Sequence, residues 1–81
     1  MDIFIYFKND NDIELDEIEE MLDDLLYGKG EVTGTGIGIA GCNLDIELYE
    51  KMNIDDVLTV LRKLKLPKDA YCKIAGEKYI I

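Results

Sequence analysis

The pattern of apolar and polar residues divides the first third of the chain into a strand and a helix. Residues 3–7 are β-branched or aromatic throughout, which favours a strand at the centre of a sheet. Between residues 16 and 27 apolar side chains recur at intervals of three and four, which is the stripe of an amphipathic helix. We expect Asp16 to cap this helix and Gly28 to end it in the left-handed conformation.

Two stretches of strict alternation in the middle of the chain predict a hairpin. Residues 31–41 and 44–50 each alternate, which predicts two strands, with Cys42-Asn43 as the turn between them. Because a glycine inside a strand costs roughly 0.5–1 kcal/mol relative to alanine, a row of glycines on one face of the first strand needs a reason. Internal packing, such as a bulge or a strong twist, is one explanation, and a flat docking surface is the other. The row consists of Gly34, Gly36 and Gly38.

The rest of the chain predicts a second helix and a last strand. We expect Asn53 to cap the helix and Pro67 to stop it, with the basic residues of positions 62–65 in its last turn. Residues 70–75 and 78–81 form the last strand, in which Gly76 sets a bend or a short hairpin.

The length of 81 residues predicts a single domain, residues 1–81, and the order β-α-β-β-α-β predicts the α+β class. It is the order of the ferredoxin-like fold, in which two helices cover one face of a four-stranded antiparallel sheet. We expect these residues to face the helices: Ile3, Ile5, Phe7, Leu44, Ile46 and Leu48. On the opposite face we expect the glycine row with Phe4, Tyr6, Asp45, Glu47 and Tyr49, and Tyr71 is a further candidate for this face.

The composition excludes most catalytic schemes. The chain has no His, no Trp and a single Arg, Arg62, so the commonest general base and transition-metal ligand is missing. Hydrophobic residues make up 48% of the sequence, enough for a globular fold although the net charge of −9 favours disorder. We therefore expect a folded protein that is not an enzyme, with no catalytic residues, no metal and no cofactor.

The negative charge is concentrated at the start of the chain. Residues 1–27 hold ten acids against Lys8, whereas residues 28–81 hold eight acids and eight bases. A field of this sign repels nucleic acid and anionic membranes and attracts basic surfaces. We expect a basic protein as the partner, and neither nucleic acid nor a membrane.

The sequence also predicts a cytoplasmic location. It begins with no basic segment of the signal-peptide type and contains no apolar run of about 18 residues, so we expect neither a signal peptide nor a membrane span. Cys42 and Cys72 lie in strand-like stretches, and in a reducing compartment we expect two buried free thiols.

Two motifs resemble ligand-binding loops without meeting their requirements. Residues 36–41 match G-x-G-x-x-G, but this segment is itself a strand that leads into another strand, whereas a dinucleotide-binding loop opens a helix. The acids of residues 10–16 alternate as calcium ligands do, yet the glycine at the sixth position and the closing Glu are absent. Neither motif predicts a specific site.

Two groups of side chains are candidates for contact with a partner. Acids in the first helix are spaced four residues apart, where like charges repel, although acids also favour a helix N-terminus and keep a small protein soluble. The outer face of the sheet combines aromatic rings with carboxylates, which suits a basic protein and opposes RNA. The partner-binding residues that we predict are Asp16, Glu17, Glu20, Asp23 and Asp24 on the helix, and Tyr6, Asp45, Glu47 and Tyr49 on the sheet.

Parts of the sequence resemble small immunity-type proteins, which accompany bacterial polymorphic or contact-dependent toxins. The similar segments are residues 30–36 (GEVTGTG), residues 43–47 (NLDIE) and the helix opening at residues 15–17 (LDE). The resemblance implies an inhibitor that binds the toxin domain of its own bacterium, often a cationic nuclease. An acidic chain agrees with this, because acidic surfaces accelerate association with basic partners.

Other functions remain open. A small-molecule regulatory domain of the ACT type shares the predicted topology and would hold an amino acid or similar ligand at glycine-rich loops of a dimer interface. A phage-type DNA mimic is a third alternative, whereas an acylphosphatase-type enzyme is disfavoured because Arg62 lies at the wrong end of a helix. We expect a monomer or a weak homodimer.

Overall fold

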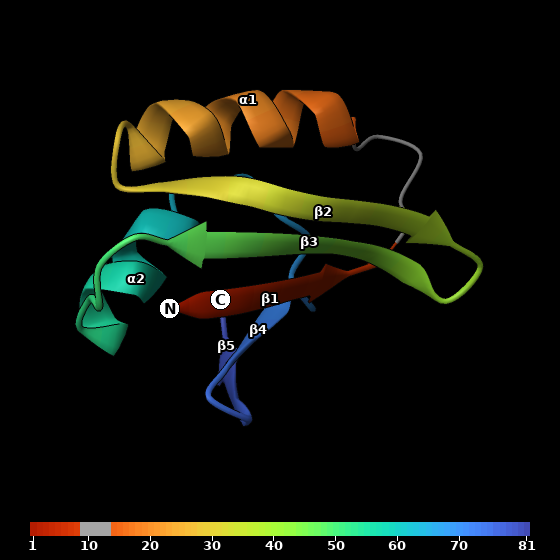
Figure 1. Ribbon diagram of the computed structural model, residues 1–81. Coiled ribbons are helices and arrows are strands. Elements are labelled where there is room, and N and C mark those ends of the chain that lie inside the picture. Colours follow the sequence, from red (N-terminus) through yellow and green to blue (C-terminus); the bar gives the residue numbers. More distant parts are fainter. Residues whose placement is uncertain (9–13) are drawn as a thin grey trace.

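Residues 1–8 and 14–81 are described by the computed structural model and form five strands and two helices (Figure 1). The elements are, in chain order, β1 (Asp2–Phe7), α1 (Leu15–Leu26), β2 (Gly30–Gly38), β3 (Gly41–Leu48), α2 (Ile54–Leu61), β4 (Tyr71–Ile74) and β5 (Glu77–Ile80). The polar turn expected at residues 9–12, and with it Asp10 and Asp12 of the calcium-like run, lies outside the described residues.

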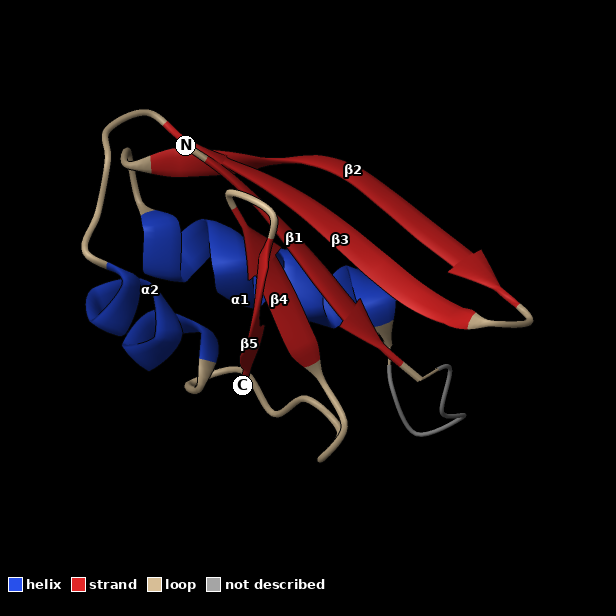
Figure 2. Ribbon diagram, turned by 90° about the horizontal axis from the view of Figure 1, so that it is seen from below, coloured by secondary structure: helices blue, strands red, loops and turns tan. Residues whose placement is uncertain are grey.

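The strands pair into one antiparallel sheet in the order β2-β3-β1-β4-β5. Both helices lie on the same face of this sheet (Figure 1 and Figure 2). The predicted α+β class with two helices is therefore confirmed. The prediction of a four-stranded sheet is wrong, because the described residues form five strands.

The fifth strand arises at Ala75-Gly76, where the sequence predicted a bend or a short hairpin. These two residues have φ values of 52° and 81°, and a tight two-residue hairpin turn requires positive φ at both central positions. The chain therefore reverses, and β5 pairs with β4 so that Cys72 lies opposite Tyr79. The hairpin alternative is correct, and the last stretch of the chain is two strands.

The hairpin of β2 and β3 turns earlier than predicted. Gly38 pairs with Gly41, so the turn is formed by Ile39-Ala40, and the predicted turn residues Cys42-Asn43 belong to β3 instead. Gly41 has a φ of 135°, and a Cβ at this position would lie 2.7 Å from the carbonyl oxygen of Phe7. Only glycine fits both constraints at position 41, which directly follows the Ile39-Ala40 turn.

The variant Gly41→Ala is expected to lower the free energy of unfolding by roughly 1–3 kcal/mol, because the added Cβ forces a strained backbone against a neighbouring strand. Gly38→Ala is the matched control in the same turn, since a Cβ there has no neighbouring atom nearer than 4.0 Å. Urea unfolding of the two variants measures the difference. Equal free energies of unfolding would contradict the role assigned to Gly41.

The helix boundaries differ from the predicted ones at two ends. Helix α1 begins at Leu15, so Asp16 lies in its first turn and is not the cap, whereas Gly28 has the expected positive φ of 71°. The Asn53 side chain caps α2 as predicted, by accepting a hydrogen bond of 2.8 Å from the Asp55 N–H. Helix α2 ends at Leu61, so the bases of positions 62–65 follow it instead of occupying its last turn. Neither α1 nor α2 is long and apolar enough to cross a membrane.

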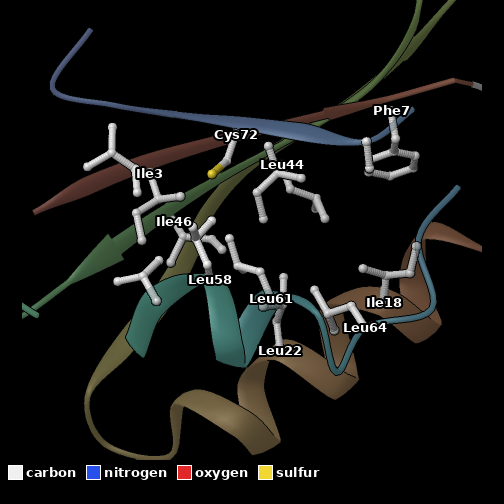
Figure 3. Packing of buried hydrophobic residues seen from close by; sticks show 14 of the residues in the cluster. Ile3, Phe7, Ile18, Leu22, Leu44, Ile46, Leu58, Leu61, Leu64 and Cys72 are labelled. Carbon is white, nitrogen blue, oxygen red and sulfur yellow. The ribbon is translucent and has the colours of Figure 1, made fainter. Parts of the chain in front are cut away.

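The core lies between the sheet and the two helices (Figure 3). Side chains from α1 and α2, among them Leu22 and Leu61, point toward the inner face of the sheet. Cys42 and Cys72 are buried free thiols, as predicted. All the residues predicted to face the helices are buried: Ile3, Ile5, Phe7, Leu44, Ile46 and Leu48.

Candidate functional site

The face of the sheet that points away from the helices, here called the open face, brings three acids into line. Asp2 on β1 pairs in register with Glu47 on β3, and Glu47 pairs in register with Glu31 on β2. The three residues alternate with core positions on their strands, so their side chains share the open face. All three are exposed. We call Asp2, Glu47 and Glu31 the carboxylate row.

The carboxylate row is unfavourable for the isolated fold. Like charges directly opposite each other on neighbouring strands are destabilising, by an amount of order 0.2–1 kcal/mol for a pair. No salt bridge to any member of the row occurs within residues 1–8 and 14–81, where the ion pair found joins Lys8 Nζ to Asp69 Oδ2 at 3.6 Å. Stability of the monomer therefore does not account for this arrangement.

Two exposed rings flank the row. Phe4 lies next to Asp2 along the open face of β1 and is 39% exposed, and Tyr49, which follows β3, is 58% exposed. Partial desolvation, together with the nearby carboxylates of Glu31 and Glu47, raises the pKa of Tyr49 above its ordinary value. Tyr49 therefore presents a protonated phenol beside carboxylates and an apolar ring at the same place.

Removing the charge of Glu47, the central member of the row, is expected to lower the pKa of Tyr49 and to reduce the repulsion within the row. In Glu47→Gln the pKa of Tyr49 should fall toward its ordinary value, because one of the carboxylates that raise it is gone. The fold should gain about 0.2–1 kcal/mol at low ionic strength and less at high ionic strength, since salt screens exposed charges. Glu50→Gln, which removes one charge outside the row, is the control for both the NMR titration of the Tyr49 ring and the unfolding measurement.

Two glycines of β2, Gly34 and Gly36, have an internal explanation. The register between β2 and β3 shifts between Val32 and Gly34, which is the bulge that the sequence left as one alternative, and beyond it Gly34 faces Asp45 across the strands. A Cβ at Gly34 would lie 3.1 Å from the Asp45 carboxylate, and one at Gly36 would collide with the Asn43 side-chain oxygen. The glycines thus leave room for side chains of β3 that lean toward the edge of the sheet.

Asp45, which also lies on the open face, is held by hydrogen bonds within the β2–β3 hairpin. Its carboxylate accepts a hydrogen bond of 3.4 Å from the Asn43 amide, and its main-chain oxygen accepts one of 3.3 Å from the Thr33 hydroxyl. Both contacts link Asp45 to the β2–β3 hairpin. Asp45 therefore contributes charge to the open face from a position that the hairpin holds in place.

Tyr6, the other predicted ring on the open face, lies in a separate cluster. Its ring stacks on Tyr71 of β4 with centroids 5.2 Å apart, and Lys78 of β5 lies 4.3 Å above the Tyr71 ring. This half of the open face carries cations, including Lys73 opposite Phe4 in the register of β1 and β4. The open face is thus acidic toward β2 and basic toward β5.

The predicted helix acids are exposed on α1, which lies on the other side of the sheet from the carboxylate row (Figure 2). The predicted contact residues of the helix and those of the sheet therefore lie on opposite sides of the molecule and do not form one surface. The exception is Asp23, which with Glu19 borders a hollow of about 430 Å³ that also includes residues 31–35 of β2. The predicted helix residues are Asp16, Glu17, Glu20, Asp23 and Asp24.

Sequence reasoning missed Asp2, Glu31 and Glu19 as members of the site. Asp2 and Glu31 become neighbours of Glu47 only through the pairing register, which no local pattern gives. Strict alternation put Glu31 on the face opposite Gly34 and Gly36, and the bulge brings all three to the open face. The like-charge pair that Glu19 forms with Asp23 on one helical stripe was the signal that could have singled out Glu19.

A second hollow lies at the end of the sheet where β1 begins. It measures about 910 Å³ and is bordered by Met1, Asp2 and Phe4, by residues 51–55 at the start of α2 and by the β4–β5 turn. Phe4, Met52 and Ile74 supply apolar surface to it, while Asp2 and Lys51 supply charge. A small molecule with both apolar and charged groups matches this lining.

Metal-binding geometry is not found in the part of the chain that the structure describes: no group of three or more Cys, Asp or Glu side chains there is arranged to hold an ion. Searches against protein-family models, curated proteins and solved structures found no match for this chain.

Proposed function

We propose that this chain is a non-catalytic acidic binding protein that inhibits a basic protein by direct contact, as an immunity protein does with the toxin of its own bacterium. The observation that carries the proposal is the carboxylate row. Its three acids repel one another in the free protein. A cationic surface placed over them would attract all three and so offset their mutual repulsion.

The surroundings of the row support the same function. Phe4 and Tyr49 are exposed beside it, and aromatic side chains next to charged groups are typical of the residues that dominate binding energy at protein interfaces. The net charge of −9 attracts a basic partner from a distance and accelerates association. The predicted helix acids, exposed on α1, contribute to this field.

The proposal also includes a ferredoxin-like fold for most of the chain. The resemblance to immunity-type proteins includes a ferredoxin-like layout, and we propose this layout for β1 to β4 together with α1 and α2. In this interpretation β5 is an addition at one edge of the sheet. The added strand carries Lys78 and leaves the acidic half of the open face uncovered.

Small-molecule binding of the ACT type is the second candidate, and the hollow at the start of β1 is the observation that favours it. Amino acids and similar metabolites would then raise the melting temperature of the protein, with a weaker effect in Met52→Ala. A melting temperature unchanged by a panel of such compounds would count against this candidate.

The leading proposal is tested with the product of the gene adjacent to this one. Co-expression is expected to neutralise the toxicity of that product, and calorimetry is expected to show a complex that weakens steadily as salt is added. The variant Asp2→Asn/Glu31→Gln/Glu47→Gln should bind less tightly, whereas Glu50→Gln should bind as the unmodified protein does. A complex indifferent to both salt and the row variant would overturn the proposal, as would the absence of any complex.

A further inference from the structure

We infer that the free edge of β2 is a second recognition element, which pairs with an extended segment of the basic partner that ends in lysine or arginine residues. The inference rests on the proposed function and specifies how part of the partner is held. It joins three features of one strand: unpaired main-chain groups, an exposed apolar tip and an acidic hollow.

The unpaired main-chain groups follow from the hairpin geometry. Among residues 1–8 and 14–81, strand β2 is at the edge of the sheet and pairs on one side, with β3. Residues that close a two-residue hairpin turn exchange hydrogen bonds, and such pairs alternate with unbonded pairs along the ladder. Gly38 with Gly41 is the closing pair and Gly36 with Asn43 is the next bonded pair. The N–H and C=O groups of Thr35 and Ile37 therefore point outward, away from β3.

This part of the edge lacks the features that protect free edges from pairing. Charged side chains, especially lysine, and proline are the usual protection, and residues 34–40 contain neither. The apolar side chains at the tip are exposed, Ile37 to 64% and Ile39 fully. The hairpin that carries them projects beyond the other strands (Figure 2). The bulge between Val32 and Gly34 limits regular pairing to the stretch that follows it.

The acidic hollow lies at the other end of the same edge. Glu19 and Asp23 border it from α1, and Glu31 borders it from β2. A segment that paired with Thr35 and Ile37 would continue past the bulge into this hollow. Its side chains on the helix side of the edge would meet the carboxylates of α1. Those on the open-face side would meet the carboxylate of Glu31.

Charge decides between the two possible kinds of added strand. A second copy of this chain carries the same net charge of −9 and would bring a second acidic edge against the first. An extended segment with apolar residues followed by cations matches both ends of the edge. Strand addition of this type obtains affinity from main-chain hydrogen bonds and specificity from alternate side chains.

A synthetic peptide measures this recognition directly. The probe is an alternating Val-Thr run followed by alternating Lys-Thr, of roughly eight residues, which at ~3.3 Å per residue follows the edge from the tip to the hollow. Two further peptides of the same sequence carry N-methyl groups on alternate residues, one set in each phase. Pairing to β2 uses the N–H groups of one phase only, so one methylated peptide should bind as the parent does and the other about tenfold or more weakly.

Matched variants of the protein test the same contact from the other side. Thr35→Pro removes an outward N–H at an edge position where proline is tolerated, whereas Thr35→Ala keeps the N–H and removes the hydroxyl. Thr35→Pro should bind the parent peptide about tenfold more weakly, and Thr35→Ala should bind it unchanged. Urea unfolding of both variants identifies any loss of folding. The inference is overturned if the two methylated peptides bind equally, if folded Thr35→Pro binds normally, or if the parent peptide fails to bind at low salt.

The same variants keep this inference distinct from the proposed function. Suppose that Thr35→Pro still forms a salt-sensitive complex with the whole basic partner at unchanged affinity. The inference about the β2 edge is then wrong, whereas the proposed acidic binding function is retained. If the carboxylate-row variant also binds the whole partner at unchanged affinity, both the edge inference and the proposed function are wrong.

Discussion

Reversing two charges of the carboxylate row, in Glu31→Lys/Glu47→Lys, is expected to slow association with the basic partner by roughly 10- to 1,000-fold at low ionic strength. Each reversal removes an attractive charge and adds a repulsive one where the partner docks. The two positions face each other across β2 and β3, so the change is concentrated in one patch. Stopped-flow association rates over a salt series measure the effect, which should shrink as screening increases.

The control for this variant has the same net charge but leaves the row intact. Glu50→Lys/Glu77→Lys alters one residue after β3 and one on β5, at the opposite edge of the sheet. It should slow association much less, because only the long-range field changes. Equal slowing by both variants would show that net charge, and not the carboxylate row, governs encounter with the partner.

Truncation of Leu44 in Leu44→Ala is expected to lower the free energy of unfolding by about 3–5 kcal/mol, because it removes buried methyl groups and leaves a cavity. Leu44 is fully buried on the central part of the sheet and faces the helix layer (Figure 3). A domain of this size has a stability near the lower end of the usual 5–15 kcal/mol, so the variant should retain only a small part of the stability of the unmodified chain. Circular dichroism during thermal and urea unfolding measures the loss.

Val32→Ala is the matched control for the core truncation. Val32 packs against the core from the edge strand but is only partly buried, so its truncation should cost less than that of Leu44. A loss equal to that of Leu44→Ala would mean that the edge strand contributes as much to stability as the centre of the sheet. That outcome would contradict the assignment of β2 as a strand available for a partner.

Most of the fold could be predicted because local pattern and burial agree. A β-branched and aromatic run identified β1, alternation along β3 identified its inward positions, and an apolar stripe identified α1. The fifth strand could not be predicted in the same way, because it depends on Ala75 adopting a positive φ that alanine rarely takes. The hairpin turn was misplaced for a related reason: Gly41 is required by the nearby Phe7 carbonyl, which is distant in sequence.

The candidate site was predictable only in part. Residues Asp45, Glu47 and Tyr49 follow from alternation on one strand, and the structure places them on the open face or beside it. Asp2 and Glu31 join them through pairing between strands, and the bulge at Thr33 decides the face on which Glu31 lies. Register between strands and the position of a bulge depend on tertiary packing, so the carboxylate row emerges only in the folded chain.

The most direct test of the carboxylate row is the dissociation constant of Glu31→Gln/Glu47→Gln for the basic partner at low ionic strength. These substitutions relieve repulsion in the free protein, so the variant remains at least as stable as the unmodified chain and any weaker binding reflects the contact itself. If the row receives a cationic surface, the dissociation constant should rise about tenfold or more, the equivalent of roughly 1.4 kcal/mol. A dissociation constant equal to that of the unmodified protein would contradict this role.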